Sequence, residues 1–276
     1  MIMTKCKIVF TDLDGTLLRH DKTMSDEDIA ILEELGEKKI VRVLATGRSL
    51  YSLSRIFEDD FQHFDYIIFS CGVGIMNWNT KEILCSHFLS KNEIKRVREA
   101  LDLHHIDYMI HKPVPDNHKF HYQKFSTENH DFDRRFSYYQ DCGSPFSSNE
   151  TNLEKASQII AVIPEDVEKF EIIRKLLPDL KVIRTTSPID HKSLWIEIFP
   201  KNVSKGHAAE WLCEHLDISR EETFGIGNDY NDIELLEWTA YSYVVKNAPD
   251  ELKNRYKTTA SNQCSGFSKV IREIFL

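Results

Sequence analysis

Residues 9–18 read VFTDLDGTLL, and this stretch decides the fold. The apolar run that begins at Cys6 is typical of a short buried strand, and it ends at an acidic turn that contains glycine. Further strand patterns at 40–45, 66–70 and 223–226 alternate with helical patterns. Because this alternation indicates a parallel sheet with right-handed crossovers, we predict that residues 9–18 open an α/β domain.

The alternation is interrupted in the middle of the chain. A helical stripe over 90–103 is followed by strand patterns at 159–163, 181–185 and 194–199, and the α/β pattern resumes only at Ser204. We therefore predict a core domain made of residues 1–84 and 201–276, with an α+β domain of residues 85–200 inserted into it.

Composition excludes several classes of protein. The chain has 276 residues and a formal net charge of −9, which argues against broad contact with nucleic acid or anionic lipid. No apolar run approaches the ~20 residues of a membrane span, and the N-terminus shows no signal-peptide segment, so we expect a cytoplasmic protein. The six scattered cysteines include no Cys-x-x-Cys pair, which favours reduced thiols over disulfides or a zinc site.

Three of the predicted strands end in polar turns built from small residues. These turns read DLDGT at 12–16, TGR at 46–48 and GNDYND at 227–232. In an open parallel sheet, ligands bind outside the carboxyl ends of the strands, so the three turns converge on one site. Lys205, at the predicted start of a helix, is a candidate fourth contributor.

The residue types in these turns suit phosphoryl chemistry. Asp12 and Asp14 are one residue apart, so on an extended chain their carboxylates point the same way and favour a cation such as Mg²⁺ between them. A carboxylate beside such a cation can attack phosphorus. The Thr46 hydroxyl and the Gly47 amide are suited to holding phosphate oxygens. Taken singly, these residues are also explained as turn carboxylates, a helix N-cap and a surface lysine.

In this order, the motifs resemble the haloacid dehalogenase superfamily of phosphatases, in particular the Cof-type hydrolases with a large α/β cap inserted after the third strand. The resemblance covers the whole chain and rests on VFTDLDGTLL at 9–18, ATGR at 45–48, VSKG at 203–206 and GIGNDYND at 225–232. It implies a Rossmann-like, doubly wound core and a cap domain that sets substrate specificity.

The resemblance also implies roles for single residues. Asp12 would be the nucleophile, and Asp14 would protonate the leaving oxygen and later activate water. Thr46, Gly47 and Lys205 would hold the phosphoryl group. The predicted Mg²⁺ ligands come from the first and last motifs, and Asn231 would support them from behind: Asp12, Asp14, Asn228, Asp229 and Asp232.

Two positions depart from the family pattern. Relatives usually carry an acid where this chain has Asn228, and a unit charge 4 Å away is worth up to roughly 4 kcal/mol at an effective dielectric of 20. We therefore expect an active enzyme with a weaker Mg²⁺ site, because the amide oxygen can still ligate. Relatives commonly have Asn where this chain has Cys71, which affects one contact on the substrate side.

The sequence favours a Mg²⁺-dependent phosphatase of small phosphorylated metabolites, and by resemblance of sugar phosphates. Two other functions stay open. A phosphomutase would use the same core to return the phosphoryl group to a substrate hydroxyl. A non-catalytic binding protein is suggested only by Asn228. We expect a monomer or a homodimer.

Overall fold

The computed structural model describes residues 6–57, 62–146, 153–187, 189–190 and 192–275. The chain divides into two compact units, of which one is discontinuous in sequence. The core unit comprises residues 1–86 and 204–276, and the inserted unit comprises residues 87–203. Each unit has its own sheet and its own apolar core.

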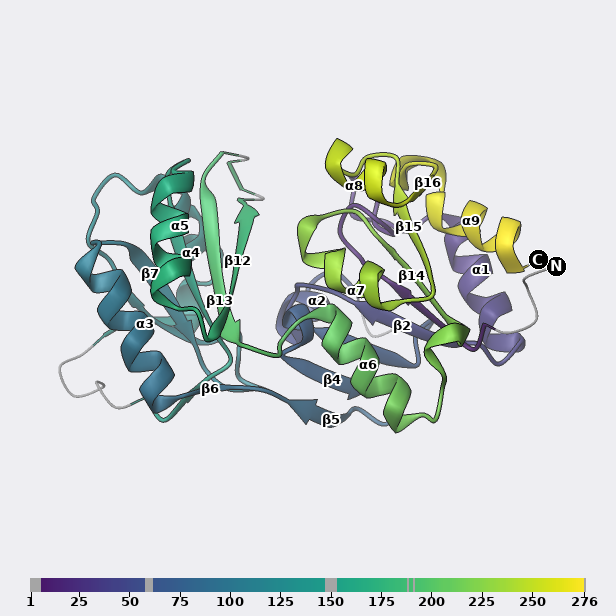
Figure 1. Ribbon diagram of the computed structural model, residues 1–276, viewed down its shortest axis with the longest axis horizontal. Helices are drawn as coiled ribbons and strands as arrows, with labels where there is room; N and C mark the ends of the chain where they lie inside the picture. The colour runs from purple at the N-terminus through teal and green to yellow at the C-terminus, as the bar shows by residue number, and fades with distance from the viewer. Residues whose placement is uncertain (1–5, 58–61, 147–152, 188, 191, 276) are drawn as a thin grey trace. The chain divides into compact units, whose positions relative to one another are not determined.

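The core unit contains an eight-stranded sheet (Figure 1). Six neighbouring strands run parallel, and the last two form an antiparallel extension at one edge. In spatial order the strands are β16 (Lys257–Thr259), β15 (Tyr241–Val245), β14 (Thr223–Gly227), β1 (Ile8–Thr11), β2 (Val41–Ala45), β3 (Tyr66–Phe69), β4 (Gly74–Asn77) and β5 (Glu82–Ser86).

The order of these strands reverses at the centre of the sheet. From β1 the chain builds outward through β2 and β3, whereas the later part of the chain adds β14, β15 and β16 on the other side. This arrangement confirms the predicted doubly wound α/β core. The carboxyl ends of β1 and β14 therefore flank a topological switch point, where open α/β sheets bind ligands.

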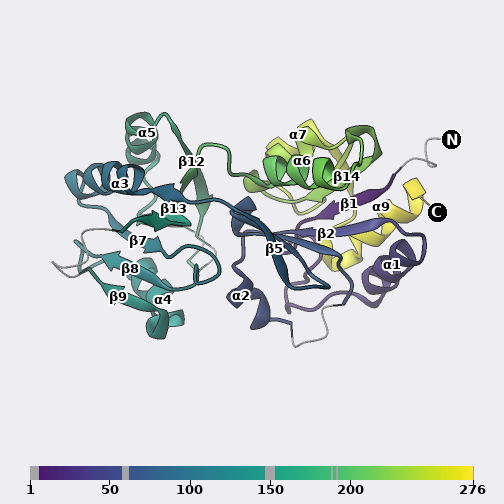
Figure 2. The same ribbon diagram turned by 90° about the horizontal axis from the view of Figure 1, so that it is seen from below.

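Helices cover both faces of this sheet (Figure 2). The helices of the core unit are α1 (Asp26–Glu37), α2 (Leu50–Ser54), α6 (Lys205–His215), α7 (Ile233–Trp238), α8 (Asp250–Arg255) and α9 (Gly266–Phe275). On one face, Ala208 and Leu212 of α6 and Leu235 of α7 pack on Phe10 and Val43, and these side chains are buried. Helices α1 and α9 lie on the opposite face, as Figure 2 shows.

The inserted unit is built around a second sheet. Its spatial order is β12 (Leu180–Thr186), β13 (Leu194–Pro200), β11 (Gln158–Ile163), β7 (Asp107–His111), β8 (Phe120–Gln123) and β9 (Gly143–Pro145). Neighbouring strands are antiparallel except for β8 and β9. A short ladder pairs β6 (Leu89–Ser90) with β10 (Lys155–Ala156).

Both faces of the second sheet are covered (Figure 2). Helices α3 (Lys91–Leu103) and α5 (Val167–Leu176) pack on one face through Ile94, Val97 and Ile173, among other residues. Helix α4 (His130–Tyr138) packs on the other face through Phe132. This unit is the α+β insertion that the sequence predicts. Within the described part of the chain, no helix is long and apolar enough to span a lipid bilayer.

Candidate active site

The candidate site lies where β1 and β14 end. These strands are neighbours, with Thr11 opposite Ile226, and the Asp12 N–H donates to the Ile226 carbonyl at 3.0 Å. Asp12 follows β1 directly, Thr46 follows β2, and Asn228 follows β14. The sheet therefore brings the three predicted turns to the edge formed by the carboxyl ends of its strands.

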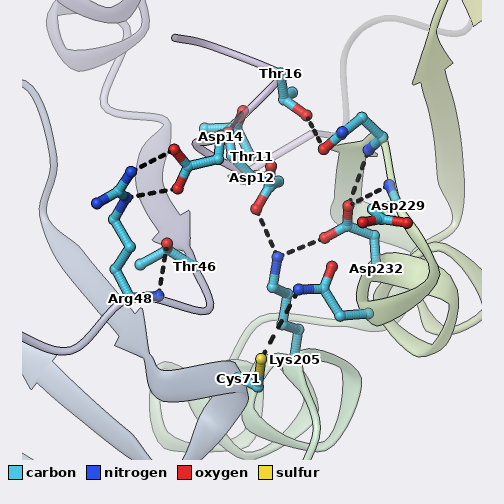
Figure 3. A network of polar contacts seen from close by, with 12 residues as sticks. Thr11, Asp12, Asp14, Thr16, Thr46, Arg48, Cys71, Lys205, Asp229 and Asp232 are labelled. Atoms are coloured by element: carbon cyan, nitrogen blue, oxygen red, sulfur yellow. Dashed lines mark hydrogen bonds and ion pairs between the residues drawn. The ribbon is translucent and has the colours of Figure 1, made fainter. Parts of the chain in front are cut away.

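A buried lysine connects two of these turns (Figure 3). Lys205 Nζ donates to Asp12 Oδ1 at 2.6 Å and to Asp232 Oδ1 at 2.6 Å. Lys205 and Asp232 are completely buried, and Asp12 is 4% exposed. Ser204 caps the helix that Lys205 begins, and its Oγ accepts from the His207 N–H at 3.1 Å. The lysine is thus held inside the protein, whereas an isolated lysine at a helix start is usually solvated.

The charges of this buried group are strongly coupled. Burial and the neighbouring Asp232 carboxylate raise the pKa of Asp12 to about 7, although the Lys205 ammonium opposes that rise. Burial disfavours the charged form of Lys205, but the carboxylates of Asp12 and Asp232 outweigh it and raise its pKa. The lysine therefore stays an ammonium, because one cation between two carboxylates is better stabilised than a neutral amine.

The turn after β14 is organised by the second oxygen of Asp232. Asp232 Oδ2 accepts from the backbone N–H groups of Asn228 at 2.8 Å and Asp229 at 3.0 Å. A Cβ at Gly227 would lie 2.5 Å from this oxygen, so only glycine fits there. Asp229 Oδ1 accepts from the Tyr230 N–H at 2.7 Å, and burial raises the pKa of Asp229. Both aspartates thus accept hydrogen bonds from the turn itself.

Asp14 takes a different direction from Asp12. Its carboxylate forms a two-pronged ion pair with Arg48, with Nε and Nη2 each 2.6 Å from an oxygen (Figure 3). Lys22 Nζ lies 3.7 Å from the same carboxylate. The sequence predicts that the carboxylates of Asp12 and Asp14 face one point. The structure pairs one with Lys205 and the other with Arg48.

The turn after β2 is closed by its own hydroxyl. Thr46 Oγ1 accepts from the Arg48 N–H at 3.1 Å, and its proton can still be donated. A Cβ at Gly47 would lie 3.4 Å from Cys71 Sγ and 3.5 Å from Asn231 Nδ2, so Gly47 is next to both side chains. Asn231 Nδ2 donates to Cys71 Sγ at 3.8 Å. Asn231 therefore connects the turn after β14 to the end of β3.

Oxygen atoms gather around the side-chain amide of Asn228. The amide group that faces Asp12 lies 3.0 Å from Asp12 Oδ2, 2.9 Å from the Asp14 carbonyl oxygen and 3.1 Å from Thr16 Oγ1. Ligands at ~2.1 Å from Mg²⁺ in an octahedron are about 3.0 Å from one another. An inward-facing Asn228 oxygen thus lies at the spacing of neighbouring Mg²⁺ ligands from the Asp12 carboxylate and from the Asp14 carbonyl, and all three are oxygen donors of the kind that this ion prefers.

This donor set differs from a cluster of acidic side chains. Among the residues that the structure describes, no group of three or more His, Cys, Asp or Glu side chains could hold a metal ion. The set found here combines one carboxylate with a backbone carbonyl and an amide. That Asp229 and Asp232 also bind the ion stays a prediction, since the oxygens named above accept hydrogen bonds from Lys205 and from backbone amides.

Comparison with known proteins shows the family of the chain. The sequence profile of the haloacid dehalogenase-like hydrolases matches residues 9–271. The chain belongs to this family. The match includes both halves of the core unit and the whole inserted unit, so it confirms the resemblance drawn from the motifs and identifies the chain as a hydrolase of the phosphatase type.

Several relatives match this haloacid dehalogenase-like hydrolase along nearly its full length. A "putative phosphatase" of Haemophilus influenzae is 24% identical over 275 residues, with 98% of each chain covered. The 5-amino-6-(5-phospho-D-ribitylamino)uracil phosphatase YitU of Bacillus subtilis is 24% identical, with 99% of this chain and 98% of the relative covered.

Solved structures share the fold of both units. BT1666, a phosphatase of the same superfamily from Bacteroides thetaiotaomicron, has a TM-score of 0.80 at 17% identity and covers 99% of this chain and 96% of its own. The subclass IIB sugar phosphatase BT4131 has a TM-score of 0.78 at 19% identity, with 97% and 98% covered. At these identities the likeness establishes the fold.

Sequence reasoning assigned no role to three residues of this hydrolase's site. Arg48 pairs with Asp14, Thr16 touches the Asn228 amide, and Asn247 Nδ2 donates to the Gly15 carbonyl at 2.8 Å. Arg48 and Thr16 lie within the motifs at 45–48 and 9–18, so the sequence could have identified them as residues of the site. Asn247 is 232 residues from Gly15 in the sequence, and only the fold brings them together.

Proposed function

We propose that this chain is a Mg²⁺-dependent phosphatase that hydrolyses small phosphorylated metabolites, sugar phosphates first among them, through a phosphoryl group carried on Asp12. The observation that carries the proposal is the buried Asp12 carboxylate at the switch point of the sheet. One of its oxygens is held by the Lys205 ammonium, and the other lies 3.0 Å from the Asn228 amide, which also faces the Asp14 carbonyl.

The proposed reaction has two steps. In the first, an Asp12 oxygen attacks phosphorus, the bond from phosphorus to the ester oxygen breaks, and protonated Asp14 donates its proton to that oxygen. In the second, Asp14 accepts a proton from water as the water attacks phosphorus. The bond between Asp12 and phosphorus then breaks, and inorganic phosphate leaves.

Positive charge and hydrogen-bond donors stabilise the phosphoryl group during both steps. Lys205 is already an ammonium and is held next to the nucleophile, so its charge is in place before the substrate arrives. The Thr46 hydroxyl and the Gly47 N–H are the proposed further donors. Mg²⁺, when bound by Asp12, the Asp14 carbonyl and Asn228, would neutralise phosphate charge and fix its orientation.

Arg48 bears directly on the role of Asp14. Both oxygens of the carboxylate accept hydrogen bonds from the guanidinium, so neither is placed to donate a proton to a substrate. Asp14 must therefore leave Arg48 to act as the acid, whereas the paired state suits its return as a base. The side chain of Asp14 is 39% exposed, which leaves room for that movement.

The inserted unit is proposed to recognise the part of the substrate beyond the phosphate, as the resemblance predicts for residues 85–200. Relatives support a polyhydroxylated substrate. One relative is named as acting on a phosphoribitylamino-uracil and one structural neighbour is a sugar phosphatase. Both names describe phosphate esters of hydroxylated carbon chains, which is why sugar phosphates are proposed first.

Replacing the nucleophile tests the chemistry. Asp12→Asn removes the attacking charge, and we expect turnover to fall by at least about 10³-fold, in line with losses of other catalytic nucleophiles. Circular dichroism should show that the variant is folded. Asp250→Asn, at a side chain 91% exposed, is the matched control and should keep the parental rate. Parental turnover by Asp12→Asn would refute the nucleophile assignment.

A substrate panel tests the reaction class. Sugar phosphates, nucleotides and a phosphoribitylamino-pyrimidine should be assayed for released phosphate, with Mg²⁺ and with a chelator. Phosphate release that needs Mg²⁺ supports the proposal. Transfer of phosphate between two hydroxyls of one substrate, with none released, would indicate a phosphomutase instead. Binding without turnover across the panel would indicate a non-catalytic binding protein.

A further inference from the structure

The orientation of the Asn228 side-chain amide decides whether its nitrogen or its oxygen faces Asp12 and the Asp14 carbonyl. Its inward-facing group is 2.9 Å from the Asp14 carbonyl oxygen and 3.0 Å from Asp12 Oδ2, and both of these atoms only accept hydrogen bonds. The third neighbour, Thr16 Oγ1 at 3.1 Å, can donate or accept.

With no cation present, the inward group must be the nitrogen. The two protons of the amide NH₂ can then be donated to Asp12 Oδ2 and to the Asp14 carbonyl, the two neighbours that only accept. An inward oxygen would instead face two acceptors at hydrogen-bond distance, and only the Thr16 hydroxyl could donate to it. Buried acceptors left without a donor destabilise the folded state, so the nitrogen-inward orientation is preferred.

With a cation present, the preference reverses. An amide nitrogen has no lone pair to offer a hard cation, whereas the amide oxygen is one of the ligands that Mg²⁺ accepts. The side chain must therefore make a half-turn about its Cβ–Cγ bond. Gly15 leaves space for this turn, since a Cβ there would lie 2.6 Å from Asn228 Nδ2 when the oxygen faces inward, and its φ of +80° suits glycine.

We propose that Asn228 occupies its own metal site: its NH₂ group replaces the cation in the metal-free protein, and the amide turns to present its oxygen when Mg²⁺ binds. This inference rests on the proposed Mg²⁺ dependence. An aspartate at this position could not act in this way, because a carboxylate donates no hydrogen bond and would repel Asp12 until the cation arrives. Asn228 thus stabilises the metal-free protein and lowers the affinity of the site for Mg²⁺.

Two substitutions in the 276-residue chain separate the stability of the metal-free site from its affinity for Mg²⁺. Asn228→Asp adds charge and removes both donors, whereas Asn228→Ala removes the donors without adding charge. In metal-free protein, we expect both variants to have a lower melting temperature than the parent, with Asn228→Asp the lower. Asn79→Asp, at an exposed turn residue, makes the same charge change elsewhere and should melt like the parent.

Calorimetric titration measures how tightly the parent and each variant bind Mg²⁺. Asn228→Asp should bind Mg²⁺ about tenfold more tightly or better than the parent, because it adds a carboxylate ligand and has no amide to displace. Asn228→Ala should bind more weakly than the parent. An Asn228→Asp variant that is as stable as the parent without metal, and no tighter in binding, would overturn the proposal.

The amide protons report the half-turn directly. In a ¹H–¹⁵N spectrum of metal-free protein, the Asn228 side-chain pair, assigned by its loss in Asn228→Ala, should exchange slowly with water. It should shift or speed up on addition of Mg²⁺. Fast exchange without metal, or an unchanged signal when calorimetry shows bound Mg²⁺, would contradict the proposal. If no variant binds Mg²⁺, the proposed metal dependence fails, while the metal-free measurements still decide the orientation of the amide.

Discussion

At the scale of single residues, the central feature of the site is a lysine surrounded by carboxylates. Lys205 has no exposed surface, and both of the carboxylates that it contacts are buried as well. Removing one partner from such a group leaves the others as uncompensated buried charges, which is far more costly than losing a surface ion pair. Lys205 therefore stabilises the core unit in addition to its proposed role toward phosphate.

Lys205→Met tests this role in stability. The side chain keeps its approximate length but loses its charge, which leaves Asp12 and Asp232 facing each other without a cation. We expect the free energy of unfolding to fall by about 3–5 kcal/mol, measured by urea denaturation at pH 7. Lys269→Met, at an exposed position of α9, is the matched control and should change it little. Equal stability of the two variants would show that the buried charge group is not stabilising.

The sequence predicted which residues belong to the site more readily than it predicted where their side chains point. Asp12, Thr46 and Asn228 were identifiable because each follows a strand of an alternating pattern, and the sheet does bring them to one edge. The pairing of Asp14 with Arg48 could not be derived, because it depends on how the chain turns at Gly15, which has a φ of +80°. An extended chain would have kept Asp14 parallel to Asp12.

At the scale of elements, the parallel strands of the core unit were the easiest to predict. A buried parallel strand such as β1 or β14 is a short apolar run that ends abruptly at a polar turn. Strand β8 and helix α4 gave weaker signals in the stretch from 104 to 150. Strand β8 reads FHYQ and is therefore not an apolar run like β1, and α4 has only nine residues, which is too short to display a clear helical period.

The end of strand β7 carries a buried histidine with a lowered pKa. His111 Nδ1 donates to the Asn117 carbonyl at 2.9 Å, and its buried Nε2 has no hydrogen-bond partner among the described residues. Burial, assisted by the positive charge of Arg135, lowers the pKa of His111 to about 3. The folded unit therefore holds this imidazole neutral, and the contact joins β7 to the loop that leads to β8.

The sign of the pH effect follows from this lowered pKa. Unfolded histidine binds a proton near pH 6.5, so the stabilisation is fully present above that pH and is lost as the pH falls toward 3. We expect His111→Asn, which retains a donor but cannot take up a proton, to flatten the loss of stability between pH 6.5 and 3. Urea denaturation across this range should show a difference of up to about 1.4 kcal/mol per pH unit. His130→Asn, at an exposed position, should keep the parental slope, and an identical slope in His111→Asn would contradict the assignment.

At the scale of the whole molecule, the inserted unit interrupts the sequence of the core unit, and each unit has its own apolar core. The hydrogen bonds and ion pairs that hold Asp12, Asp14 and Asp232 join residues of the core unit. Lys205 is the second residue of that unit after the insertion. The chain thus leaves the core after β5 and returns next to the nucleophile, so an insertion that varies in sequence need not alter the reacting groups.

The inserted unit has the features of an independently folding domain. Residues 87–203 are continuous in sequence and well above the roughly 40 residues below which domains need disulfides or metals. One face of its sheet packs on α3 and α5 and the other on α4, with separate buried clusters around Ile196 and Trp195. We expect the isolated segment to unfold cooperatively in urea and to show the helix content of α3, α4 and α5 by circular dichroism. A gradual transition, or exposed apolar surface that binds a hydrophobic dye, would show that the unit depends on the core for its structure.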